Sequence, residues 1–133
     1  MKNNKPQLEN AGKTANPQPK LIKVQEDRKG LSIDFEDGAS FNLPAEYLRV
    51  ESPSAEVQGH GPGEKILVTG RRNVGIANIE IVGNYAIRIE FDDLHDTGIY
   101  SWRYLYLLGR AQTSNWNRYK EKVSAAGLSR DPA

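Results

Sequence analysis

The sequence predicts an α+β domain in which antiparallel β-hairpins pack against short helices. Residues 31–43 and residues 74–91 each contain two strand-like stretches separated by a glycine-containing turn, the pattern of a β-hairpin. Residues 114–126 instead place apolar side chains at helical spacing. With 133 residues, of which 38% are hydrophobic, the chain is suited to one domain with its own core.

The two ends of the chain differ from its middle. Residues 1–19 are rich in Lys, Asn, Gln and Pro and have no apolar period, so they are predicted to form a disordered tail. The domain proper is expected to span residues 20–112, beginning with an edge strand over 21–24. Residues 113–133 are expected to form an amphipathic helix, which ends before Gly127, and a tail.

The first hairpin has the clearest local pattern in the chain. Apolar and polar side chains alternate over residues 31–35 and again over 39–43. The pair Asp37-Gly38 stands between them, and glycine tolerates the positive φ that a tight hairpin turn needs. Pro44 is then expected to end the strand and open a short helix over 45–49.

The middle of the chain predicts a second hairpin after a long connection. Residues 51–64 contain two prolines and three glycines and are expected to be a loop, followed by a short strand over 66–68. The strand over 74–82 changes its apolar phase midway, which predicts a β-bulge near Ala77-Asn78. The turn Gly83-Asn84 then leads into the last strand of this hairpin.

Residues 100–108 fit two different periods. Aromatic side chains recur at every second position from Tyr100 and Trp102 onward, as in a strand. Ser101 as an N-cap and Gly109 as a stop favour a short helix, and we predict the helix.

Composition excludes several classes of function. The chain has no cysteine, which rules out disulfides, thiol nucleophiles and cysteine-ligated metal centres. Its apolar runs are too short for a membrane span, and residues 1–16 lack the apolar core of a secretory signal. These observations predict a soluble cytoplasmic protein without membrane contact.

The net charge of +1 conceals an uneven distribution. Residues 30–110 hold twelve acidic and seven basic side chains, whereas the basic excess lies at the two ends. An acidic folded region repels a phosphate backbone, so nucleic-acid binding by the domain is not expected. A weak contact through lysines of the N-terminal tail is the alternative.

The densest polar cluster lies over residues 92–98, where His95 stands among Asp93, Asp96 and a further aspartate. A histidine among carboxylates can ligate a hard or borderline cation or act as a base. The alternative is a solvated connector whose Asp and Thr side chains bond to the local backbone. Composition and spacing leave both readings open.

Other polar residues give weaker indications. His60 lies in a glycine-rich stretch that lacks the Gly-Lys-Ser/Thr of a phosphate-binding loop. Arg71 and Arg72 stand in a turn, where they could bind a phosphate or carboxylate. Tyr100 and Trp102 are candidates for an aromatic partner surface or for the core. No nucleophile elbow surrounds any serine, which gives a hydrolase no support.

Three separated motifs resemble one known family. They are Leu48–Glu56 (LRVESPSAE), Val82–Ile87 (VGNYAI) and Asp92–Trp102 (DDLHDTGIYSW). Together they resemble the gamma-butyrobetaine hydroxylase-like N-terminal domain, also called domain of unknown function 971. The resemblance covers about residues 21–110.

This resemblance implies a module without its own catalytic domain. In carnitine-synthesis dioxygenases the module precedes a separate iron/2-oxoglutarate domain, and it also occurs fused to P-loop iron–sulfur carrier ATPases or alone as small bacterial proteins. Here only 23 residues follow Arg110, so no dioxygenase activity is expected.

The resemblance also implies a zinc site that this chain has lost. The dioxygenase module holds zinc with a Cys-x-Cys-x-x-Cys stretch and a later histidine. These positions fall here on Ser52, Ser54, Val57 and His95, so three of the four ligands are missing. We expect no resident cofactor, and we expect the Ser52–Val57 segment to lie against His95 through hydrogen bonds. His95 is then a relic, a structural hydrogen-bonding group or part of a different site.

The expected function is that of a non-catalytic accessory or interaction module. Its partner would be an unknown protein, an iron or iron–sulfur enzyme by family association. The candidate interaction residues are His60, Arg71, Arg72, Tyr100 and Trp102. The alternative is a metal-binding, oxidoreductase-associated protein that holds iron weakly with His95, Asp93 and Asp96. The sequence predicts no oligomeric state.

Overall fold

The computed structural model describes residues 16–59, 61 and 63–133. Over these residues the chain forms a single α+β domain of two three-stranded antiparallel sheets and four helices, which confirms the predicted fold class. Residues 1–15 of the predicted tail lie outside the described part. None of the helices among the described residues combines the length and apolar character that crossing a membrane requires.

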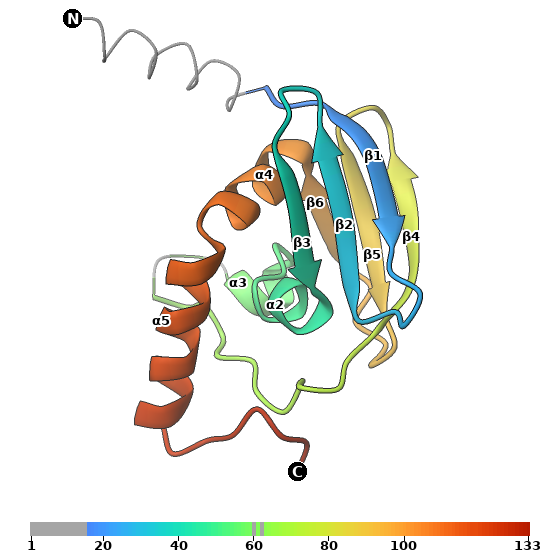
Figure 1. Ribbon diagram of the computed structural model, residues 1–133. Coiled ribbons are helices and arrows are strands. Elements are labelled where there is room, and N and C mark those ends of the chain that lie inside the picture. Colours follow the sequence, from blue (N-terminus) through green and yellow to red (C-terminus); the bar gives the residue numbers. More distant parts are fainter. Residues whose placement is uncertain (1–15, 60, 62) are drawn as a thin grey trace, which may run out of the picture.

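The first sheet has the strand order β1-β2-β3 and the second has the order β4-β5-β6. Figure 1 shows the two sheets lying face to face, with α4 beside β3 and β6 and with α2 and α5 below α4. The elements are β1 (Pro19–Val24), β2 (Gly30–Phe35), β3 (Ser40–Pro44), α2 (Ala45–Val50), α3 (Ala55–Gln58), β4 (Ile76–Val82), β5 (Ala86–Phe91), β6 (Gly98–Ser101), α4 (Trp102–Arg110) and α5 (Gln112–Ala125).

Both predicted hairpins are present. In the first, Ile33 pairs with Phe41, and the inward positions of β2 are almost completely buried. Gly38 has φ +95° in the connecting turn, the left-handed conformation for which glycine is favoured. In the second, the register of β4 against β5 shifts between Ile76 and Asn78, which confirms the predicted bulge.

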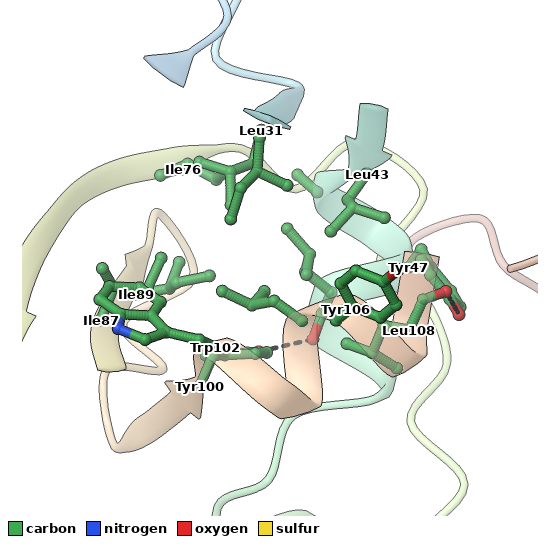
Figure 2. Close-up of a cluster of buried hydrophobic side chains, with 14 of the residues drawn as sticks. Leu31, Leu43, Tyr47, Ile76, Ile87, Ile89, Tyr100, Trp102, Tyr106 and Leu108 are labelled. Carbon is green, nitrogen blue, oxygen red and sulfur yellow. Dashed lines mark hydrogen bonds between the residues drawn. The ribbon is translucent and has the colours of Figure 1, made fainter. Parts of the chain in front are cut away.

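The core lies between the sheets and is closed by α2 and α4 (Figure 2). It contains aliphatic side chains from β2, β3, β4 and β5 together with large aromatic side chains from α2, β6 and α4. The buried phenol groups keep hydrogen-bond partners: Tyr47 donates to the Leu108 carbonyl at 2.7 Å, and Tyr100 donates to the Leu48 carbonyl at 2.6 Å.

Residues 100–108 contain both a strand end and a helix, the two structures that their apolar periods fit. Tyr100 lies in β6, a short strand that we did not predict. The Ser101 side chain accepts a hydrogen bond from the Tyr104 N–H at 3.0 Å, so the predicted N-cap is confirmed and α4 begins at Trp102. Gly109 does not stop the helix, and that prediction is wrong. A Cβ on Gly109 would lie 2.4–2.6 Å from the Phe41 ring, so this position needs glycine for close packing.

Two expectations for the middle of the chain are also wrong. The predicted loop over 51–64 contains the short helix α3. The predicted strand over 66–68 is wrong: these residues are coil, and Leu67 and Val68 pack beside Tyr119 of α5. The final helix begins slightly earlier than predicted, at Gln112, and Gly127 follows it with φ +69° as expected.

Candidate functional site

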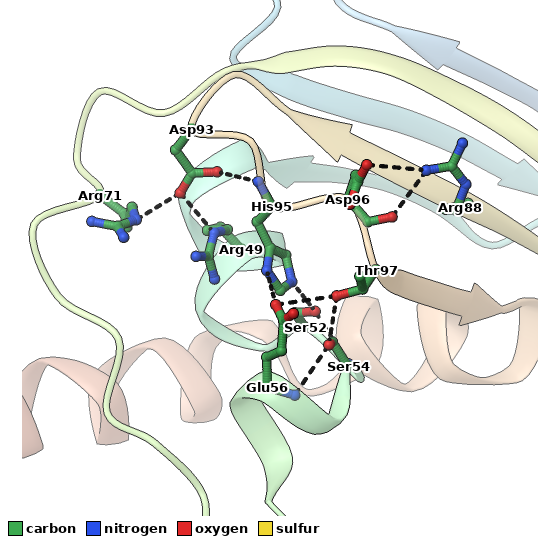
Figure 3. Close-up of polar contacts among 10 residues, drawn as sticks. All are labelled: Arg49, Ser52, Ser54, Glu56, Arg71, Arg88, Asp93, His95, Asp96 and Thr97. Atoms are coloured by element: carbon green, nitrogen blue, oxygen red, sulfur yellow. Dashed lines mark hydrogen bonds and ion pairs between the residues drawn. The ribbon is translucent and has the colours of Figure 1, made fainter.

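Two segments far apart in the sequence meet at the predicted histidine (Figure 3). The first follows α2 and leads into α3, and the second is the 92–97 loop between β5 and β6. The Ser52 Oγ atom lies 2.9 Å from His95 Nε2. The expected hydrogen-bonded contact between the Ser52–Val57 segment and His95 is therefore present.

A second layer of contacts reinforces this one. Ser54 caps α3 by accepting the Glu56 N–H at 3.2 Å, and its hydroxyl lies 2.7 Å from Thr97 Oγ1. The Glu56 carboxylate lies 3.2 Å from His95 Nδ1 and accepts a hydrogen bond from Thr97 at 3.3 Å. We call Ser52, Ser54, Glu56, His95 and Thr97 the serine–histidine junction.

The serine–histidine junction is closed to solvent at its centre. Ser52 is fully buried and the His95 residue is 7% exposed. A Cβ on Gly98 would lie 2.7 Å from Ser52 Oγ, so β6 approaches this hydroxyl too closely for any side chain at that position. Val57, the third of the implied zinc positions, is a buried apolar side chain.

The order of contacts at this junction is that of a serine–histidine–carboxylate triad. A hydroxyl, an imidazole and a carboxylate lie in line, which in a hydrolase would be nucleophile, base and orienting group. A nucleophile must also reach a substrate, and Ser52 is fully buried. Its Oγ also accepts the Ser54 N–H at 3.2 Å. The arrangement therefore serves cohesion between the two segments in this conformation.

The contacts define the state of the imidazole. Burial, followed by the positive charge of Arg49, lowers the pKa of His95 below its ordinary value despite the opposing carboxylates of Glu56 and Asp93. A neutral imidazole has one donor and one acceptor nitrogen. Because a carboxylate only accepts, we assign the proton to Nδ1, facing Glu56, and the acceptor role to Nε2, facing the Ser52 hydroxyl.

Two arginines hold the start of the 92–97 loop. The Asp93 Oδ2 atom lies 2.8 Å from Arg49 Nε and 2.7 Å from Arg71 Nε, while its Oδ1 accepts the His95 N–H at 3.2 Å. Burial alone would raise the pKa of Asp93, but the Arg49 hydrogen bond, the backbone bond and the two positive charges together lower it.

The residues of the alternative metal site have different partners. Asp93 pairs with two arginines, both His95 nitrogens have protein partners, and Asp96 lies 3.7 Å from Arg88. Across residues 16–59, 61 and 63–133, no group of three or more His, Asp or Glu side chains is placed to hold a metal ion. A cation at His95 would have to displace Ser52 or Glu56 from the imidazole.

The predicted interaction residues do not form one surface. Tyr100 and Trp102 lie in the core, because β6 and the first turn of α4 turn these rings inward. Of the two interpretations of these rings, the core is confirmed and the partner surface is wrong. Arg71 is bound to Asp93, and Arg72 forms an ion pair with Asp131. His60 lies outside the described residues.

Sequence reasoning missed the most exposed apolar side chain of the loop. Leu94 is 88% exposed and has φ +74°, a left-handed conformation that bulky side chains rarely adopt. Backbone bonds from Leu94 N–H to the Phe91 carbonyl and from Phe91 N–H to the His95 carbonyl hold this tip in place. Only the tertiary structure reveals this conformation, because the local sequence has neither Gly nor Asn at this position.

Comparisons with known proteins agree on one family. The family described as "Gamma-butyrobetaine hydroxylase-like, N-terminal" matches residues 22–106. None of the curated proteins matches this chain.

Three solved structures are similar over most of their length. One NMR solution structure is 43% identical with a TM-score of 0.77, covering 88% of this chain and 92% of the other. A second is 46% identical with a TM-score of 0.75, covering 88% of this chain and 87% of the other. A crystal structure of a protein of unknown function in the DUF971 family, from Acidithiobacillus ferrooxidans, is 36% identical with a TM-score of 0.58, covering 69% of this chain and 92% of the other. The chain therefore belongs to the gamma-butyrobetaine hydroxylase-like N-terminal family.

Proposed function

We propose that this chain is a non-catalytic module that binds a protein partner, and that the 92–97 loop is its contact surface. The observation that carries the proposal is the conformation of Leu94, which is 88% exposed at φ +74°. Neither burial nor backbone preference favours leucine there, and such strain costs about 1–2 kcal/mol. A leucine held in this way is well suited to enter an apolar pocket of another protein.

The surroundings of Leu94 support a role in recognition. Arg49 and Arg71 brace the loop through Asp93, so a partner would meet a preorganised surface and would not have to order it. Glu56 of the adjoining helix α3 and Asp96 of the loop itself add exposed carboxylates. The partner surface would therefore combine an apolar pocket with a basic rim.

The class of partner follows from the family. Modules that resemble this chain are fused to P-loop iron–sulfur carrier ATPases, so this chain is suited to bind such an ATPase. On that association, its role would be in iron or iron–sulfur metabolism.

The test is a titration of the ¹⁵N-labelled chain with the purified P-loop iron–sulfur carrier ATPase of the same organism. Saturable shifts centred on residues 92–97 are expected. Leu94→Asn should weaken binding at least tenfold while leaving the fold intact, because asparagine tolerates the positive φ. Ile81→Thr, which removes another exposed apolar side chain from β4, should leave affinity within twofold. No binding, or equal affinity of the Leu94→Asn variant, would contradict the proposal.

A further inference from the structure

A groove lies between residues 65–68 and α5. Its lining includes no residue of the serine–histidine junction or of the 92–97 loop. Its cavity measures about 140 Å³ and is lined by Val50, Glu51, Lys65, Ile66, Leu67, Val68, Asn115, Arg118, Tyr119 and Lys122. We call it the α5 groove. A cavity of about 150 Å³ accommodates a benzene molecule, so this groove can take one aromatic or branched aliphatic side chain.

One residue in the wall of the α5 groove, Leu67, has backbone groups without a partner among the residues that the structure describes. Residues 64–69 pass beside α5 as an open coil without helix, strand or turn (Figure 1). Ile66 N–H donates to the Val57 carbonyl, and Tyr119 donates its hydroxyl hydrogen to the Val68 carbonyl. Between them, neither the N–H nor the C=O of Leu67 bonds to any residue that the structure describes. An added antiparallel strand forms hydrogen bonds with both the N–H and the C=O of one residue, so Leu67 can accept such a strand.

The rim of the α5 groove is basic. Lys65, Arg118 and Lys122 line it, opposed by the single carboxylate of Glu51, which pairs with Lys65 at 2.8 Å. Arg118 and Lys122 are exposed and lie one turn apart on α5. Their charges remain available for carboxylates of a bound chain.

This combination identifies the occupant. We infer that the α5 groove binds an extended acidic peptide of a partner protein, which pairs with the backbone of Leu67, inserts one apolar side chain beside Tyr119 and sets carboxylates against Arg118 and Lys122. The chain's own residues 1–15 do not fit this role, since they carry Lys2, Lys5 and Lys13 against one glutamate. The α5 groove would then be a second contact surface in addition to the 92–97 loop.

Two labelled hexapeptides test the inference by fluorescence anisotropy with the full chain. One alternates Glu with Leu or Phe, and the other has Lys in place of Glu. The acidic peptide should bind at least tenfold more tightly than the basic one. The double variant Arg118→Glu/Lys122→Glu should weaken acidic-peptide binding at least tenfold. Lys120→Glu, on the same helix but outside the groove lining, is the matched control and should change affinity less than twofold.

Amide hydrogen exchange reports the proposed strand pairing separately from charge. Exchange at the Leu67 amide should slow at least tenfold in the complex. The inference is overturned if Lys120→Glu weakens binding as much as Arg118→Glu/Lys122→Glu, or if Leu67 exchange does not slow. It is also overturned if a second copy of this chain occupies the groove. That outcome would be seen as a dimer that dissociates in the Arg118→Glu/Lys122→Glu variant. None of these variants touches the 92–97 loop, so the outcome is independent of the ATPase titration.

Discussion

At the residue scale, Ser52 carries much of the cohesion of the serine–histidine junction. Its hydroxyl is fully buried, contacts His95 Nε2 at 2.9 Å and accepts the Ser54 N–H at 3.2 Å. Buried polar groups that lose their partner retain their desolvation cost. The contact is thus expected to stabilise the fold.

We predict that Ser52→Ala lowers the free energy of unfolding by about 1–3 kcal/mol, because it leaves His95 Nε2 buried without a partner. Urea unfolding followed by circular dichroism measures the change. Ser124→Ala, an exposed serine of α5, is the control and should stay within about 0.5 kcal/mol of the parent chain. Equal stability of Ser52→Ala and the parent would show that the junction contributes no cohesion.

His95 also makes stability depend on pH in a defined direction. Its folded-state pKa lies below the ordinary value of 6.5, so the unfolded chain takes up a proton at this group before the folded chain does. The stability it contributes is therefore complete above pH 6.5 and is lost as pH falls through the folded-state pKa. Asp93, whose pKa lies below 3.8, acts only in the more acidic range.

The prediction is that the urea midpoint decreases between pH 7.5 and pH 5.5 and that His95→Gln reduces this decrease. Glutamine can still donate to Glu56 and accept from Ser52 but does not titrate. The measurement compares the two pH slopes and not the absolute midpoints, so that an effect of the substitution on packing does not enter the comparison. An unchanged slope in His95→Gln would assign the pH dependence to other groups.

At the scale of elements, the approach of α4 to β3 shows how packing overrides helix propensity. Gly109 lies within α4, and a Cβ there would meet the Phe41 ring at 2.4–2.6 Å. In an exposed helix, replacing glycine by alanine gains about 1 kcal/mol. Here the added methyl group must displace an aromatic ring.

We predict that Gly109→Ala lowers the free energy of unfolding by about 1–3 kcal/mol, the usual cost of overpacking. Thermal and urea unfolding provide the measurement. Adding Phe41→Leu to Gly109→Ala should recover part of the loss, because it removes the ring that the methyl group meets. A Gly109→Ala variant more stable than the parent would mean that α4 can move away from β3 at little cost.

At the scale of the whole molecule, the C-terminal residues tie α5 back to the domain. The backbone N–H groups of Gly70 and Arg72 donate to the carbonyls of Ser129 and Arg130 at 3.1 and 3.0 Å. The Arg130 guanidinium contacts both carboxylate oxygens of Glu46 at 2.8 Å and lies 5.0 Å from the Trp116 ring centre. Arg130 therefore connects the C-terminal residues to α2 through Glu46 and to α5 through Trp116. Glu46 is only 7% exposed, so the ion pair is partly shielded from water.

We predict that Arg130→Ala lowers the free energy of unfolding by about 1.5–3 kcal/mol, the range for hydrogen bonds to a charged group. Glu46→Gln combined with Arg130→Ala should recover part of that loss, because the carboxylate left without a partner is then neutral. Arg118→Ala, an exposed arginine of α5, should remain within about 0.5 kcal/mol of the parent. An Arg130→Ala variant as stable as the parent would contradict a structural role for the chain end.

The candidate site was only partly predictable. Composition and spacing singled out His95 and its carboxylates, and the resemblance placed Ser52 and Ser54 against it. The contact between Glu56 and Thr97 could not be predicted, because the two residues lie 41 positions apart and no spacing pattern connects them. Asp93 would be a ligand in the alternative metal site, but two arginines from other parts of the chain pair with it.

The sequence by itself determined the features that neighbouring residues control: the two hairpins, the bulge in β4, the Ser101 cap and the glycine that follows α5. Tertiary structure alone decided that residues 66–68 lie beside α5, that Gly109 stays inside α4 and that Tyr100 and Trp102 are core side chains. The physical reason is range: turn, cap and strand periods depend on residues a few positions apart, whereas burial and close approach depend on which distant surfaces meet.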